Sequence, residues 1–144
     1  MNISFTWKRR IRVNSRGKVP GAKMADVKET LEELSRIDGF VAAAIVDGSS
    51  GMMLGELGGG MINLEVAAAG NTEVVRSKRK VMKNLALNDR IEDILINLEK
   101  QYHLIRPADQ DRMDVFIYLV LDRERSNLAL ARVKLKSCEA SLEI

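Results

Sequence analysis

The residues able to do chemistry are few and stand far apart in the sequence. There is one histidine, His103, and one cysteine, Cys138. His103 has no serine or cysteine partner at a spacing typical of nucleophilic catalysis, and Cys138 falls on a helical stripe of leucines. These residues predict a structural or surface histidine and a buried, inert thiol. They also exclude a His-rich metal site and a thiolate zinc cage, so we expect no enzyme and no metal.

Two further motifs resemble ligand sites but lack essential members. The three glycines at 58–60 precede a predicted helix, where backbone amides could hold a phosphate. They lack both the Lys-Ser/Thr of a phosphate loop and the spacing of a dinucleotide fingerprint. The carboxylates Asp109, Asp111 and Asp114 lack the glycine and the closing glutamate of a calcium loop. Both segments are therefore predicted to be ordinary loops, and we expect no bound cofactor. Because the chain has no nucleotide-binding motif, we do not expect it to be a GTPase itself.

Charge is distributed unevenly along the 144 residues. The first 25 residues carry seven basic side chains and no acid, which leaves a net charge of −4 for the rest because the whole chain carries +3. Residues 1–23 form a basic arm, and residues 24–144 form the expected domain. The arm is expected to be a poorly ordered leader. The apolar residues of the arm alternate with polar ones, which leaves open an extra strand docked on the domain or on a partner: Ile3, Phe5, Trp7, Ile11 and Val13. Its positive charge leaves open contact with a membrane or a nucleic acid.

Hydrophobic periodicity predicts eight elements in the order α-β-β-α-β-β-β-α. Two continuous apolar runs, residues 40–46 and 115–121, are typical of central strands covered on both faces. The sequence therefore predicts an α+β sandwich with a five-stranded antiparallel sheet and helices on both faces. The expected helices cover residues 26–37, 62–87 and one starting at a Ser126 cap, and the expected strands cover 40–46, 52–57, 90–98, 102–106 and 115–121.

The strand at residues 90–98 is the best candidate for an exposed sheet edge. Ile94 and Ile96 alternate with polar neighbours such as Asp93, so this strand is predicted to be half buried. An edge strand with an apolar face can pair with a second copy of itself. We therefore predict a homodimer with Asp93, Ile94 and Ile96 at its edge.

A basic run near the end of the long helix is the strongest charged feature within the domain. Helical spacing places Arg76, Lys80 and Lys83 near one face, with Arg79 close by. A solvated helix end is the simplest interpretation, and a docking patch for an acidic protein surface is the functional one. Nucleic-acid binding is not expected, because this segment has no aromatic residue on which bases could stack.

The order of these elements resembles a known family. Residues 39–51 read GFVAAAIVDGSSG, which is similar to the first hairpin of the roadblock, or dynein light-chain, family. A long helix rich in small residues follows at 63–85, and the apolar strand at 115–121 matches the fifth strand of that family. The resemblance covers residues 24–142 and leaves out the basic arm.

The resemblance implies a profilin-like roadblock fold and a non-catalytic protein. Members form homodimers or heterodimers, often by joining their third strands into one sheet with the long second helices side by side. Bacterial members of the MglB-like type accompany small Ras-like GTPases. We therefore expect a homodimeric adaptor that binds and regulates such a GTPase. The alternatives are a structural or sensory scaffold without a GTPase, and nucleic-acid or membrane association through the arm.

Two remaining expectations follow from what the sequence lacks. No apolar run approaches the ~20 residues that a membrane span needs, and no segment reads as a secretory signal, so we expect a cytoplasmic protein. Arg76 and Arg79 are the residues considered for the role of an arginine finger. We do not expect one, because nothing in the spacing fixes either guanidinium.

Overall fold

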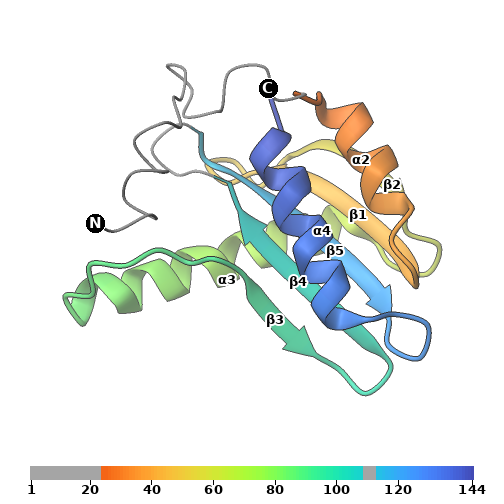
Figure 1. The fold of residues 1–144 in the computed structure, drawn as a ribbon. Helices are drawn as coiled ribbons and strands as arrows, with labels where there is room; N and C mark the ends of the chain where they lie inside the picture. Colours follow the sequence, from red (N-terminus) through yellow and green to blue (C-terminus); the bar gives the residue numbers. More distant parts are fainter. Residues whose placement is uncertain (1–23, 109–112) are drawn as a thin grey trace, which may run out of the picture.

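The computed structural model describes residues 24–108 and 113–144, so the basic arm, Asp109 and Asp111 lie outside the described residues. Within that part no helix is long and apolar enough to cross a membrane. The eight elements appear in the predicted order (Figure 1): α2 (Val27–Ser35), β1 (Phe40–Asp47), β2 (Met53–Gly58), α3 (Leu64–Asn84), β3 (Ile94–Asn97), β4 (Gln101–Pro107), β5 (Val115–Asp122) and α4 (Leu128–Ser141).

The five strands form one antiparallel sheet in the order β2-β1-β5-β4-β3. The two continuous apolar runs, β1 and β5, are neighbours within the sheet, and β5 is its central strand. This confirms the predicted α+β class. It also leaves one strand at each edge, β2 on one side and β3 on the other.

Helices cover both faces of the sheet, as predicted. Alternate residues of the central strands point to opposite sides, so each strand contributes to two separate cores. Ala43 and Leu119 belong to the core under α2 and α4, whereas Ala44 and Tyr118 belong to the core under α3. In Figure 1, α2 and α4 lie on one side of the sheet and α3 crosses the other.

Side-chain caps define where the helices begin. The Asp26 carboxylate accepts a hydrogen bond from the Glu29 amide at 2.8 Å, as the first-turn pattern predicted. The predicted cap of the last helix is wrong by one residue. Asn127 caps α4, because its backbone is extended and its side-chain oxygen accepts from the Leu130 amide at 3.1 Å. The hydroxyl of Ser126 is instead buried without a hydrogen-bond partner.

The edge strand β3 is shorter than the predicted strand at 90–98. The first paired residue of β3 is Ile94, which lies opposite Ile105 of β4, and Asp93 is outside the pairing. Continuing the same register would place Glu92 opposite Pro107, which has no N–H to donate. Residues 90–93 therefore lead into the strand without extending the sheet.

Candidate functional site

The structure places two of the three predicted edge residues, Ile94 and Ile96, in an edge strand, and Asp93 directly before it. Among the described residues β3 pairs only with β4, with Ile96 opposite His103. Ile94 and Ile96 are half buried and pack against the core under α3, whereas Leu95 packs under α4. The strand therefore holds its side chains inside the fold and leaves its outer backbone edge for pairing.

Asp93 does not face outward from this edge. Its carboxylate accepts hydrogen bonds from Arg132 of α4, at 3.1 Å from Nε and 2.5 Å from Nη2. The Asp93 side chain is 9% exposed and that of Arg132 is 45% exposed. The bonds to Asp93 raise the pKa of the Arg132 guanidinium above its ordinary value. Asp93 therefore ties the start of β3 to α4.

A second arginine holds the other end of β3. Arg123, which follows β5, donates from Nη1 to the Asn97 side-chain oxygen at 2.7 Å and to the Leu98 carbonyl at 2.9 Å. Its guanidinium also lies over the ring of Tyr102, 5.2 Å from the ring centre. Sequence reasoning missed this contact, because no local pattern connects Arg123 with Asn97.

The long helix α3 carries an apolar stripe on the side away from its own sheet. Leu64, Ala68 and Val75 face the core, and the opposite side bears exposed apolar or small residues at helical spacing. A Cβ added at Gly70 would meet no heavy atom within 4 Å, so the stripe is open at that point. We call this set the outer stripe: Val66, Gly70, Val74, Ser77, Val81 and Leu85.

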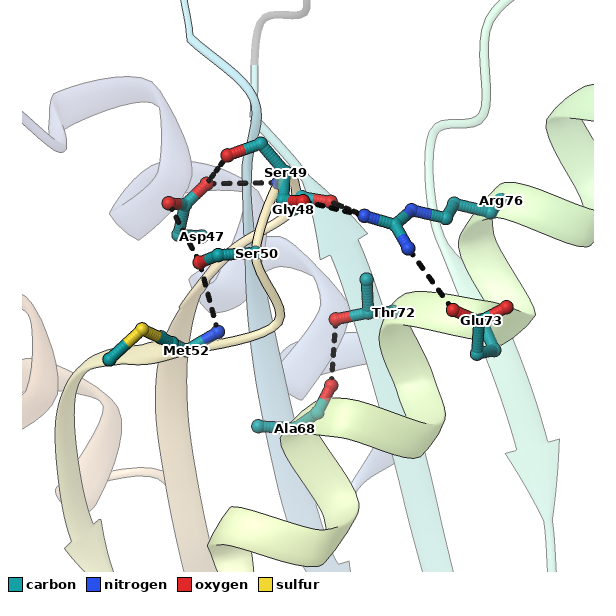
Figure 2. Close-up of polar contacts among 9 residues, drawn as sticks. All are labelled: Asp47, Gly48, Ser49, Ser50, Met52, Ala68, Thr72, Glu73 and Arg76. Carbon is teal, nitrogen blue, oxygen red and sulfur yellow. Dashed lines mark hydrogen bonds and ion pairs between the residues drawn. The ribbon is translucent and has the colours of Figure 1, made fainter.

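The basic run near the end of α3 divides into two parts. Arg76 donates from Nη2 to the carbonyls of Gly48 and Ser49, at 3.2 and 2.6 Å, and pairs with Glu73 (Figure 2). Arg79 lies 3.5 Å from the Asp114 carboxylate. Arg76 is itself exposed, but it and Arg79 fasten α3 to neighbouring loops, whereas the exposed Lys80 and Lys83 extend into solvent.

The carbonyls that hold Arg76 are presented by a turn between β1 and β2. Asp47 accepts hydrogen bonds from the Ser49 amide at 2.9 Å, the Ser49 hydroxyl at 2.7 Å and the Ser50 hydroxyl at 3.0 Å (Figure 2). These bonds, chiefly that from the Ser49 hydroxyl, lower the pKa of Asp47. Local spacing gave no sign of what holds the Arg76 guanidinium, because this turn holds it from a distant part of the sequence.

The histidine and the cysteine have structural surroundings. His103 contacts the Gln101 side-chain oxygen through Nε2 and the Tyr118 hydroxyl through Nδ1, both at 2.9 Å. This arrangement suits a neutral ring that donates to Gln101 and accepts from Tyr118, and burial lowers the pKa of His103. Burial also raises the pKa of the half-buried Cys138 thiol. Within residues 24–108 and 113–144, no three His, Cys, Asp or Glu side chains gather where they could hold a metal.

The glycine loop before α3 uses its backbone within the fold. The Gly59 amide donates to the Val41 carbonyl at 3.2 Å, and the Gly59 carbonyl accepts from the Ile62 amide at 2.7 Å. The Val66 amide donates to the side-chain oxygen of Asn63 at 3.1 Å, so Asn63 caps α3. This segment is therefore built as a turn leading into a capped helix.

Comparison with known proteins finds likeness in structure and none in sequence. No protein-family model and no curated protein sequence matches the chain. The structure of Myxococcus xanthus MglB superposes with a TM-score of 0.70 at 14% identity, covering 80% of this chain and 89% of that one. A Roadblock/LC7 domain from Streptomyces avermitilis gives a TM-score of 0.70 at 13% identity, over 81% of this chain and 94% of that one.

A third solved structure agrees with these two. The gliding protein MglB of Thermus thermophilus superposes with a TM-score of 0.66 at 19% identity, covering 78% of this chain and 82% of that chain. Identities this low establish the fold and leave the function open. The resemblance read from the hairpin at residues 39–51 is confirmed at that level, and the chain has the roadblock fold.

Proposed function

We propose that this protein is a non-catalytic, homodimeric adaptor that binds and regulates a small Ras-like GTPase. The observation that carries the proposal is the exposed outer stripe of α3. The next element along the chain is β3, whose outer backbone edge is open. Soluble proteins rarely leave long apolar stripes uncovered without a partner. A second copy would cover the stripe with its own α3 and pair with the edge through its own β3, as the family resemblance implies.

The two arginines that hold the ends of β3, Arg132 at Asp93 and Arg123 at Asn97, support the dimer. A strand held at both ends loses little conformational freedom when another strand pairs with it, so more of the contact energy remains for association. Asp93 contributes by positioning the strand, while Ile94 and Ile96 support it from the core side. The role of these three residues at the dimer edge is thus one of shaping the pairing surface.

The GTPase contact is assigned to the basic end of α3. Lys80 and Lys83 are exposed cations that suit an acidic protein surface, while Arg76 and Arg79 hold the helix in place. An arginine finger is not part of the proposal, because Arg76 already donates to Gly48, Ser49 and Glu73. Any effect on GTP hydrolysis would come from repositioning groups of the GTPase. The solved structures of MglB, one of them a gliding protein, support this reading by sharing the fold.

Oligomeric state is tested by sedimentation equilibrium of the full chain. The expected mass is twice the 16.1 kDa of one chain. Val81→Asp, in the outer stripe, should weaken the dimer by about 30-fold, which corresponds to the ~2 kcal/mol of an interface anchor. Val133→Asp on α4 is the matched control, since Val133 is 65% exposed and lies outside the stripe. A wild-type monomer, or equal weakening by both variants, would contradict the dimer.

Partner binding is tested with a small Ras-like GTPase encoded in the same genome, loaded with GDP or with GTP. We expect binding to at least one form and a change in the rate of phosphate release. The double variant Lys80→Glu, Lys83→Glu should weaken binding, and the pair Lys134→Glu, Lys136→Glu on α4 should leave it unchanged. Absence of binding in both nucleotide states would favour a scaffold that acts without a GTPase.

A further inference from the structure

The opposite edge of the sheet, β2, borders an apolar groove. Among the described residues β2 pairs only with β1, so its outer backbone is also open. Between this strand and α2 lies a groove of about 480 Å³, which we call the α2–β2 groove. In Figure 1 the two elements run beside each other at one border of the molecule. It is lined by Val27, Lys28, Leu31, Glu32, Leu54, Gly55, Glu56 and Leu57.

The floor of the groove is apolar and close to the backbone. Leu54 is 44% exposed and Leu57 37% exposed, and Leu57 lies on the α2 side because it pairs with Ala43. A Cβ added at Gly55 would lie 2.5 Å from a methyl carbon of Val27, so α2 approaches the strand closely there. An extended segment laid along β2 would cover both leucines and pair with the open backbone in the same place.

The rim of the groove is acidic. Two carboxylates, Glu32 and Glu56, line the groove against one lining cation, Lys28. A basic extended segment would therefore be favoured over an acidic one.

The chain's own arm has the matching properties. Residues 1–23 carry seven basic side chains and no acid, and the apolar residues of 3–13 alternate with polar ones as an edge strand requires. The arm joins the described part at Met24, three residues before Val27 in the groove. The ten residues 14–23 can span up to ~33 Å, which exceeds the ~20 Å of a six-residue strand, so 3–13 can reach either end of β2.

The groove and the arm together lead to one inference: we infer that residues 3–13 pair with the open edge of β2 and place apolar side chains over Leu54 and Leu57. The arm then acts as a sixth strand supplied in cis. It closes this edge against other sheets and leaves β3 as the edge open to a second copy. The inference does not rest on GTPase binding, and it stands or falls separately.

The single tryptophan of the chain, Trp7, lies within the arm and reports on its surroundings. In the full-length protein we expect Trp7 emission shifted to shorter wavelength and protected from acrylamide, independently of protein concentration. Leu54→Asp should shift the emission to that of tryptophan in water and remove the protection, whereas Val133→Asp should change neither. Circular dichroism of both variants confirms that the domain stays folded.

Water-like emission in the wild type, or emission that ignores Leu54→Asp, would overturn the inference. Protection that appears only at high protein concentration would overturn it too, by assigning the groove to a second copy.

Cross-linking provides a test that does not require a disruptive charge. In a Cys138→Ala background, Leu54→Cys is combined in turn with Ile3→Cys, Phe5→Cys and Trp7→Cys. At least one pair should form a disulfide within a single chain, while the same arm positions combined with Val133→Cys should form none. Disulfides only between chains, or none with Leu54→Cys, would contradict docking in cis.

Discussion

The two edges of this sheet are attached by different forces. β3 has four residues and is fastened at both ends by arginines, Arg132 at Asp93 and Arg123 at Asn97. β2 has six residues, includes Gly55 and Gly58, and is attached through β1 and through α2 packed on one side. The first edge is short and rigidly held, whereas the second borders a groove with exposed leucines.

The difference suggests a division of roles between the edges. A strand held at both ends by hydrogen bonds from arginines keeps its register when a partner strand adds to it, which suits pairing with an identical copy. An edge with an apolar groove suits a flexible segment that brings its own side chains. The same sheet can thus offer one edge for dimerisation and close the other with its own arm. Four predictions test how each edge is held, beginning with the largest effect.

Gly58→Ala should do the most damage, at the end of β2. Gly58 has a φ of +74°, and an added Cβ would lie 2.4 Å from the Val41 carbonyl oxygen. We expect a loss of about 2–4 kcal/mol in the free energy of unfolding, from backbone strain together with a clash that the backbone cannot relieve. Denaturant titration measures this loss.

Gly60→Ala is the control for Gly58→Ala. Its φ is also positive, +49°, but an added Cβ would meet nothing within 4 Å. It should cost only the ~1–2 kcal/mol of the left-handed conformation. Equal losses of stability in the two variants would mean that the clash with the Val41 carbonyl adds no cost beyond that of the positive φ.

Arg132→Ala should release the start of β3. The Asp93 carboxylate, 9% exposed beside Arg132, would lose both hydrogen bonds, so we expect a loss of about 1–3 kcal/mol in the free energy of unfolding. Amide hydrogen exchange in Ile94–Asn97 should accelerate. Arg125→Ala breaks a surface pair with Asp122 and should cost at most ~1 kcal/mol. If adding Asp93→Ala to Arg132→Ala restores no stability, the unpaired carboxylate is not the cause.

His103 should make the strand next to β3 sensitive to acid. Burial lowers its pKa below the ordinary 6.5, so the unfolded chain binds the proton more readily than the folded chain. Its contribution to stability is therefore complete above pH 6.5 and is lost as the pH falls through the lower, folded-state pKa. Denaturation midpoints on both sides of pH 6.5 measure this effect, and His103→Gln should remove it. An unchanged pH profile in that variant would assign the acid sensitivity elsewhere.

The smallest effect is expected at the turn that leads into β2. Hydrogen bonds from Ser49 and Ser50 lower the pKa of Asp47 below its ordinary 3.8. This contribution is complete above pH 3.8 and fades as the pH falls through the folded-state pKa. Ser49→Ala should raise the Asp47 pKa toward the ordinary value, as followed by NMR titration of the carboxyl carbon. A pKa that does not move would mean that the Ser49 hydroxyl is not the main cause.

Much of the fold could be predicted from the sequence because the relevant forces act over a few residues. Alternation of apolar residues identified the strands, and the unbroken runs at 40–46 and 115–121 identified those buried on both faces. The polar residues around Ile94 and Ile96 identified β3 as an edge. Even locally there was a limit: Ser126 and Asn127 are both good caps, and only the path of the backbone after β5 selects Asn127.

Only the tertiary structure decided which side chains meet across the fold. Arg132 lies 39 positions from Asp93, Arg123 lies 26 from Asn97, and Arg76 lies 27 from Ser49. Strand register and helix packing bring such residues together, and neither leaves a repeating mark in the sequence. Helical phase placed Arg76 and Lys80 in one basic patch, but the turn at Gly48 and Ser49 engages the arginine and leaves the lysine to solvent. Local patterns thus specify elements, whereas the packing of those elements assigns each charge its partner.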